Sequence, residues 1–195
     1  MYEIELKAHV YDKNEVIKNL ETWGTFQYSS LKKDIYWQHP ESKIQIRLRE
    51  EKKSFEKNFI KIESENSIIT TIATYKQKKI ITDKNTGDFE VNNEHEFSID
   101  NPVAFETFLS DAGFSIASKK TKQVVSWKYE NALIELCNVP PLGDFLEIEI
   151  IEKNNTKEII EKNHKKLISI LLKCGISTEH IENRFYSEML KDVKS

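Results

Sequence analysis

Strict alternation of polar and apolar residues marks the strands of this chain. Near its start, Glu3, Glu5 and Lys7 alternate with Ile4 and Leu6. Side chains at every second position of a strand share a face, so the charged residues point one way and the apolar residues the other. The same alternation, or a β-branched extended character, recurs further on. We therefore predict eight strands, within residues 2–10, 25–38, 43–51, 67–80, 89–99, 115–129, 132–138 and 145–151.

Helix signals lie between and after these strands. Asp12 is a typical N-cap residue and Gly24 a typical helix end. Asn101 followed by Pro102 predicts the start of a second, short helix. With two amphipathic segments near the C-terminus, we expect four helices, within residues 12–24, 101–114, 156–175 and 177–193.

Charged residues repeat two positions apart on many of the predicted strands. The pairs are Glu3 and Glu5, Arg47 and Arg49, Lys76 and Lys78, Glu94 and Glu96, Lys120 and Lys122, and Glu147 and Glu149. Any one such strand is most simply explained by a solvated surface. Because each pair carries only acids or only bases, we predict instead that helices cover the apolar faces and that the charged faces line a barrel.

A charged barrel interior predicts a particular kind of ligand. A barrel of about eight strands can hold one small molecule, and buried charges are costly without partners. Carboxylates attract hard cations such as Mg²⁺ or Mn²⁺, whereas Arg and Lys suit phosphate oxygens. The pattern therefore indicates a metal-assisted polyphosphate site.

Length, charge and cysteine content limit the domain number, the partners and the location that we expect. The chain has 195 residues, which we expect to form a single domain over residues 1–195, and its net charge of −3 argues against a nucleic-acid partner. It shows no apolar run long enough to span a bilayer and no signal peptide, so no membrane partner is expected. The two cysteines do not form a disulfide framework, which favours a cytoplasmic protein, either monomer or homodimer.

The order of these motifs resembles the CYTH domain family, the triphosphate tunnel enzymes. This family includes class IV adenylyl cyclases, thiamine triphosphatases and inorganic triphosphatases. The resemblance covers nearly the whole chain, and "KDIY" and "LGDF" are most similar to the class IV adenylyl cyclase branch. It is carried by Glu3-x-Glu5-x-Lys7, "KDIY" (33–36), Arg47-x-Arg49, Lys76, Glu94-x-Glu96, Lys120-x-Lys122, "LGDFLEIE" (142–149) and "RFYSEML" (184–190).

The resemblance implies an α+β fold with an eight-stranded antiparallel β-barrel, a tunnel, and helices packed outside. It implies Mg²⁺ or Mn²⁺ as cofactor and a small-molecule triphosphate as substrate. The implied reaction is cyclisation of ATP to cyclic AMP and pyrophosphate, or hydrolysis of tripolyphosphate or of a nucleoside or thiamine triphosphate. The implied site residues are Glu3, Glu5, Glu147 and Glu149 for metal, Lys7, Arg47, Arg49, Lys76, Lys120 and Lys122 for triphosphate, and Tyr36, Lys76 and Glu96 for catalysis.

Several positions depart from the family pattern. Cys137 stands where the family has an Asp, and Glu135, two residues earlier on the same face, could supply the missing metal ligand. Lys122 stands where Arg is usual, and residues 52–66 look like an insertion near the tunnel mouth. Tyr36 could instead be a core residue. Two alternatives therefore stay open: a non-catalytic barrel that binds polyphosphate or nucleotide, and a structural barrel with a wet charged face.

Overall fold

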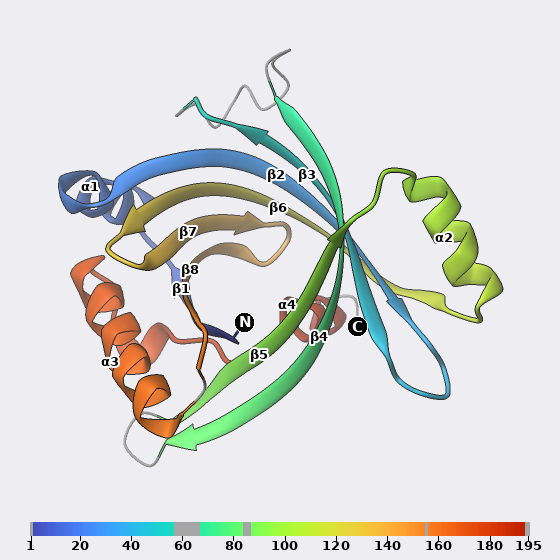
Figure 1. Cartoon of the computed structure of the whole chain (residues 1–195). Coiled ribbons are helices and arrows are strands. Elements are labelled where there is room, and N and C mark those ends of the chain that lie inside the picture. The colour runs from blue at the N-terminus through green and yellow to red at the C-terminus, as the bar shows by residue number, and fades with distance from the viewer. Residues whose placement is uncertain (1, 57–66, 84–86, 155, 194–195) are drawn as a thin grey trace.

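The computed structural model describes residues 2–56, 67–83, 87–154 and 156–193, and in the strands between 76 and 94 it describes the backbone alone. The described elements follow the chain in an order of strands interrupted by helices (Figure 1). They are β1 (Tyr2–Val10), α1 (Lys13–Trp23), β2 (Thr25–Gln38), β3 (Gln45–Ser54), β4 (Ile68–Asp83), β5 (Gly87–Ser98), α2 (Pro102–Asp111), β6 (Ser115–Tyr129), β7 (Ala132–Val139), β8 (Gly143–Glu152), α3 (Lys157–Lys173), a 3-10 helix (Thr178–His180) and α4 (Tyr186–Asp192).

The eight strands form a closed antiparallel barrel in the order β1-β5-β4-β3-β2-β6-β7-β8. Closure depends on β1, which pairs with β8 along its full length and with β5 over Tyr2–Glu5. The predicted α+β fold and eight-stranded antiparallel barrel are therefore confirmed. The strand boundaries agree closely with the expected ranges, and residues 52–54 of the expected insertion belong to β3. Its residues 57–66 lie outside the described part of the chain.

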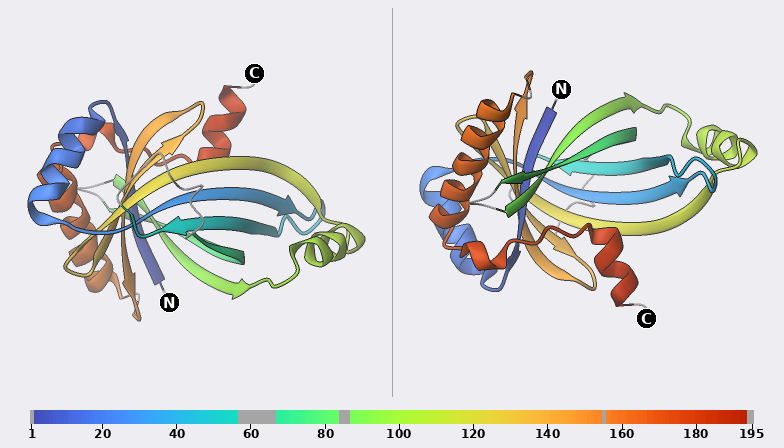
Figure 2. Two further views of the ribbon diagram at one scale, coloured as in Figure 1. Left: turned by 90° about the horizontal axis from the view of Figure 1, so that it is seen from above. Right: turned by 90° about the horizontal axis from the view of Figure 1, so that it is seen from below.

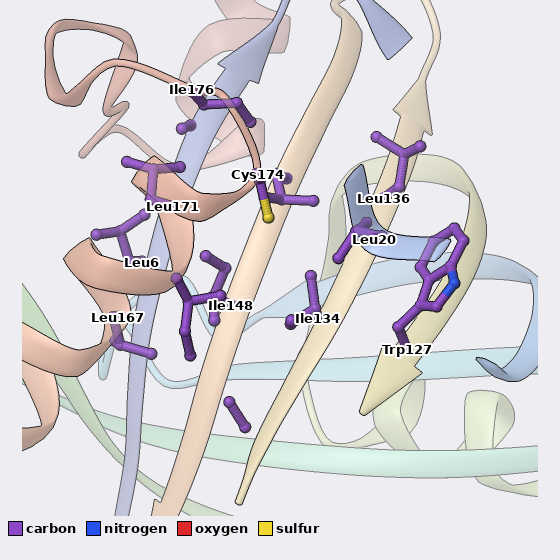
Figure 3. Close-up of a cluster of buried hydrophobic side chains, with 14 of the residues drawn as sticks. Leu6, Leu20, Trp127, Ile134, Leu136, Ile148, Leu167, Leu171, Cys174 and Ile176 are labelled. Carbon is purple, nitrogen blue, oxygen red and sulfur yellow. The ribbon is translucent and has the colours of Figure 1, made fainter. Parts of the chain in front are cut away.

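A large apolar core lies outside the barrel, against β1, β6, β7 and β8. The alternate, outward-facing residues of these strands are buried, among them Leu6, Ile134 and Ile148 (Figure 3). Helices α1 and α3 cover them, and Leu20 and Leu167 supply two of the contacting side chains. Burying a large aliphatic side chain stabilises the folded state by about 1.5–3 kcal/mol. This core therefore fixes which face of each strand points outward. The charged residues of the same strands must then face inward.

The helix ends follow from local chemistry. The Asp12 side chain accepts a hydrogen bond from the backbone N–H of Glu15 at the start of α1, and Asn101 caps α2 in the same way through Ala104. Gly113, after α2, has a φ of +86°, a conformation that glycine adopts without a side-chain clash. Both caps confirm the helix starts expected from the sequence.

A smaller apolar cluster lies between α2 and the wall made by β2, β3 and β4. It contains Trp37, Leu48, Ala73 and Leu109. Figure 2 shows α2 at the opposite end of the molecule from α1 and α3. The two ends of the barrel are therefore packed very unequally.

The expected C-terminal helix over residues 177–193 is wrong in its continuity. The structure has a 3-10 helix and α4, separated by an extended stretch. Ile181 forms a β-bridge with Ala8, and the Glu182 N–H donates to the Lys7 carbonyl at 2.8 Å. The half of β1 that does not pair with β5 offers this edge, so backbone pairing there replaces helix formation.

Helix α4 packs across one end of the barrel. Its residues Tyr186 and Met189 join inward-facing Val124, Cys137 and Phe145 in an apolar cluster, which we call the end cluster. No helix in the described part of the chain is long and apolar enough to cross a membrane. The charged interior and the end cluster together define the environment of the candidate site.

Candidate functional site

Strand pairing brings carboxylates from three strands together inside the barrel. Residues directly opposite each other in neighbouring antiparallel strands share a face. Glu5 of β1 lies opposite Glu149 of β8, and Glu147 of β8 lies opposite both Lys7 of β1 and Glu135 of β7. Four acidic side chains, Glu5, Glu135, Glu147 and Glu149, therefore line one wall of the interior.

Two buried lysines hold part of this acidic group. Lys122 Nζ lies 2.5 Å from Glu147 Oε2 and 3.2 Å from Glu135 Oε2. Lys32 Nζ lies 2.6 and 2.9 Å from the two oxygens of Glu135, and the Tyr28 hydroxyl donates to Glu135 at 2.9 Å. Glu135 thus faces inward as expected, and its oxygens already accept from three side chains.

The pKa values of these carboxyl groups differ according to their neighbours. Burial works against ionisation of Glu147, but the Lys122 ammonium lowers the pKa of Glu147 to about 2. Burial, together with the charges of Glu135 and Glu5, raises the pKa of Glu149 to about 7. Carboxylates are therefore crowded around Glu149 beyond what the two lysines neutralise, and a bound cation would relieve this repulsion.

The donor set fits a hard divalent cation. Ligand atoms of Glu135, Cys137 and Glu147 lie within 4.8 Å of one another. Burial and the charge of Glu147 raise the pKa of the Cys137 thiol, so it stays protonated and is a poor ligand for Mg²⁺. The oxygens of Glu147 and of neighbouring Glu5 and Glu149 remain as suitable donors. This acidic group could hold a metal ion.

A second charged group joins β2, β3 and β6. Asp34 is buried and accepts from Arg49 through two bonds, Nε to Oδ1 at 2.6 Å and Nη2 to Oδ2 at 3.0 Å. Lys120 Nζ lies 3.2 Å from Asp34 Oδ2, and the Tyr36 hydroxyl lies 3.4 Å from the same oxygen. Burial opposes ionisation of Asp34, but Arg49 holds its pKa well below the usual range. Asp34 therefore fixes the direction of two cationic side chains toward the interior.

Arg47 continues this row of cations on β3. Its Nη2 donates to Thr74 at 2.8 Å and to Glu96 at 3.1 Å, and the Thr74 hydroxyl donates to Glu96 at 2.9 Å. Lys76 lies on the adjacent strand, opposite Glu94, but its side chain lies outside the described part of the chain. Glu96 is thus placed as a partner of Arg47.

Lys7 links the interior to the C-terminal segment. Its ammonium donates to the carbonyl of Arg184 and lies 4.5 Å from the centre of the Tyr186 ring. The Lys120 ammonium lies 4.7 Å from the same ring. Tyr186 therefore stands between cations from β1 and β6, at the boundary between the end cluster and the charged interior.

The structure gathers most of the site residues expected from the sequence. Glu5, Lys7, Arg49, Lys120, Lys122, Glu135, Glu147 and Glu149 converge in the two charged groups, and Tyr36 shares the inner face with Asp34 rather than lying in the core. Glu3 has the same strand face but lies farther along β1, opposite Ile151. Their functional roles stay predictions.

Sequence reasoning missed Tyr28, Lys32, Asp34 and Tyr186. Its pairs of like charge did not indicate that acids and bases also alternate along one face of β2 and β3, where Lys32 and Asp34 share a face and Glu51 follows Arg49. Buried ion pairs need both signs side by side, so neighbouring positions mix them. The spacing of two that identified Arg47 and Arg49 also connects Lys32, Asp34 and Tyr36, and could have found the first two.

The closed antiparallel barrel with acids and bases paired in its interior has the architecture that the resemblance to the CYTH domain implied. The model of the CYTH domain matches residues 1–186, and the chain belongs to this family. Among its relatives is a protein of Methanocaldococcus jannaschii named "Putative adenylate cyclase MJ0240", 27% identical over 97% of this chain and 98% of the relative.

Solved structures share the fold. The PH1819 protein from Pyrococcus horikoshii is 28% identical, with a TM-score of 0.74 over 98% of this chain and 99% of that chain. HpAC1 from Hippeastrum, described as a "putative adenylyl cyclase" with "a dominant" triphosphatase activity, is 13% identical, with a TM-score of 0.63 over 98% and 95% of the two chains. This last likeness shows the fold alone.

Proposed function

We propose that the protein hydrolyses triphosphates inside the barrel with the help of a divalent cation, Mg²⁺ or Mn²⁺. One observation carries this proposal: the carboxylates of Glu5, Glu147 and Glu149 share one closed interior with cationic side chains of β3 and β6, and Lys122 of β6 contacts Glu147. Mg²⁺ is commonly held by one or two carboxylates together with substrate phosphates. The interior offers both halves of such a site.

In this proposal the cationic side chains bind and orient the triphosphate. Arg49 can present its fork to phosphate oxygens, and Lys7, Lys120 and Lys122 can add point charges. Arg47 extends the row, with Glu96 orienting it, and Lys76 stays a phosphate ligand expected from the sequence. In the free protein, carboxylates hold Arg49, Lys120 and Lys122, so phosphate binding exchanges internal ion pairs for contacts to substrate.

The acidic group has the complementary role. Glu5, Glu147 and Glu149 would hold the cation, and Glu135, held by Lys32, would position Lys122 or add a further ligand. When bound, the cation supplies neutralisation of phosphate charge and a lowered pKa for an attacking water. Hydrolysis needs only this water, the cationic side chains that bind the phosphates, and the cation.

The second candidate is cyclisation of ATP to cyclic AMP and pyrophosphate. The observation in its favour is the 27% identical relative that bears the name of an adenylate cyclase. Both reactions use the same phosphate contacts and differ in the nucleophile, water or the ribose 3′-hydroxyl. Because the fold does not determine the reaction, hydrolysis and cyclisation must be distinguished by their products.

The test is to incubate the protein with tripolyphosphate, ATP and thiamine triphosphate, each with Mg²⁺ or Mn²⁺, and to identify the products. Orthophosphate release, lost in Arg49→Ala, supports hydrolysis. Cyclic AMP with pyrophosphate supports cyclisation. Binding of tripolyphosphate without turnover under every condition would contradict both and support the non-catalytic barrel.

A further inference from the structure

Tyr186 brings a buried polar group from the C-terminal helix to the end of the barrel interior. Its residue exposure is 8%, and among the described residues its buried hydroxyl has no hydrogen-bond partner. The hydroxyl approaches the Glu147 carboxylate without reaching hydrogen-bond geometry. An unsatisfied buried hydroxyl disfavours the folded state, so a ligand that accepts its hydrogen bond would explain its presence.

The surroundings of Tyr186 indicate which kind of ligand this is. Lys7 and Lys120 place their ammonium groups 4.5 and 4.7 Å from the ring centre, and Phe145 packs edge-on with a centroid distance of 5.0 Å. A tyrosine hydroxyl is a hydrogen-bond donor at neutral pH. A donor held between two ammonium groups and next to a cation-binding carboxylate suits an anionic oxygen.

We propose that Tyr186 is a substrate-binding residue whose hydroxyl donates a hydrogen bond to a phosphoryl oxygen of the bound triphosphate, at the point where the phosphate-binding cations meet the acidic group. This inference rests on the proposed triphosphate substrate and adds a residue that β1–β8 do not supply. Tyr186 is the first residue of α4, which packs on the end cluster through Met189, so the C-terminal helix completes the barrel site.

Substrate must displace internal contacts to reach this hydroxyl. The hydroxyl is closed off from solvent, and Lys7 donates to the Arg184 carbonyl, two residues before Tyr186. Phosphates that attract Lys7 would release this carbonyl and bring the ammonium, the hydroxyl and the phosphoryl oxygen together. The contact between β1 and residues 181–184 thus connects phosphate binding to the position of Tyr186.

The test compares Tyr186→Phe with Tyr129→Phe, a matched change outside the barrel interior, where the Tyr129 hydroxyl accepts from Lys173 at 3.2 Å. Binding of imidotriphosphate, a tripolyphosphate analogue that resists hydrolysis, is measured by calorimetry in the presence of Mg²⁺. We expect Tyr186→Phe to weaken binding by about 10- to 100-fold, the range for one hydrogen bond to a charged group. Tyr129→Phe should stay within about twofold of the native protein.

Thermal unfolding without ligand separates binding from structure. Because its hydroxyl has no hydrogen-bond partner among the residues that the structure describes, Tyr186→Phe should leave the melting temperature unchanged or raise it. A lower melting temperature, or unchanged binding, would overturn the assignment of Tyr186. If the native protein itself fails to bind this analogue with Mg²⁺ present, the proposed function is wrong; if it binds and Tyr186→Phe binds equally well, only this inference is wrong.

Discussion

The wall of the barrel made by β1, β7 and β8 is backed by helices, whereas the wall made by β3, β4 and β5 is thinly covered. On the first wall, outward-facing Ile4, Ile134 and Ile148 are fully buried. On the second, outward-facing Ile69 and Phe97 remain 63% and 49% exposed. The carboxylates line the backed wall and the two arginines line the thin one.

This difference suits the two halves of the proposed chemistry. A cation needs oxygens at closely defined distances, and a wall packed at the density of a protein interior holds short side chains in place. Phosphate binding uses long side chains that adjust, and Arg49 and Lys120 are directed by the single carboxylate of Asp34. The backed wall therefore holds the cation ligands in fixed positions, and the thin wall carries long side chains that can adjust to the phosphates.

The largest expected effect comes from removing the divalent cation from the acidic group on the backed wall. Excess EDTA should abolish triphosphate turnover, because the carboxylates alone repel phosphate, and added Mg²⁺ or Mn²⁺ should restore it. The measurement is phosphate or pyrophosphate release with each cation. Turnover that continues unchanged in EDTA would show that the acidic group is not a cation site.

The thin wall is tested by removing its cations. Arg49→Ala should lower kcat/KM, or affinity for tripolyphosphate, by roughly 10- to 1000-fold, the range for losing one to a few charge-assisted contacts. Arg47→Ala should behave similarly. Lys33→Ala is the control, because Lys33 pairs with Glu50 on the outer surface. Unchanged kinetics in both arginine variants would place them outside the substrate path.

The unequal covering should appear directly in stability. Leu171→Ala, in the core under α3, should cost about 2–5 kcal/mol in the free energy of unfolding. Ile46→Ala, partly buried on the thin wall, should cost clearly less, because less apolar surface returns to water. Urea denaturation of both variants measures the difference. Equal costs would mean that the two walls are equally well packed.

The smallest effect concerns the departure at Cys137. Cys137→Asp should raise cation affinity several-fold, since it adds a hard oxygen beside Glu147, and should lower the melting temperature without cation, since it adds charge to a crowded site. Titration of Mn²⁺ and thermal unfolding measure these effects.

Glu135 completes this test. Glu135→Ala should lower activity in the native background and lower it less beside Cys137→Asp, a non-additivity expected of two residues that serve one function. Because Glu135 also holds Lys32 and Lys122, Glu135→Gln is a useful comparison. Activity untouched by Glu135→Ala would exclude Glu135 as the replacement for the missing Asp.

Alternation along single strands predicted most of the fold. It predicted the first and last residues of β2 and β6 correctly, and it placed Glu5, Lys7 and Glu147 on the inner face. It could not give the partners across the barrel, because a period of two reveals a face but not what stands opposite. Lys32 and Asp34 show the same spacing, but it does not reveal their partners Glu135 and Arg49, which lie on other strands.

The C-terminus shows a second limit. Residues 177–193 have helical character, but Ile181 and Glu182 pair with the open half of β1. That edge exists only because β5 leaves β1 after Glu5. Helix propensity depends on the local sequence alone, whereas the free edge of β1 depends on where the distant strand β5 stops pairing. Tertiary pairing therefore prevails over helix formation here.

The pairing of β1 with β8 also bears on the order of events during folding. Residues 2–10 meet residues 144–152, more than 130 positions further along the chain, and residues 181–182 join them still later. Contacts between such distant segments form slowly, because the chain between them must first lose its freedom. During synthesis on the ribosome, Glu5 and Lys7 emerge first but wait for almost the whole polypeptide before their neighbours exist. The acidic group, which needs β1 and β8 together, would then be assembled in the last steps of folding, and chains that end before β8 would lack it.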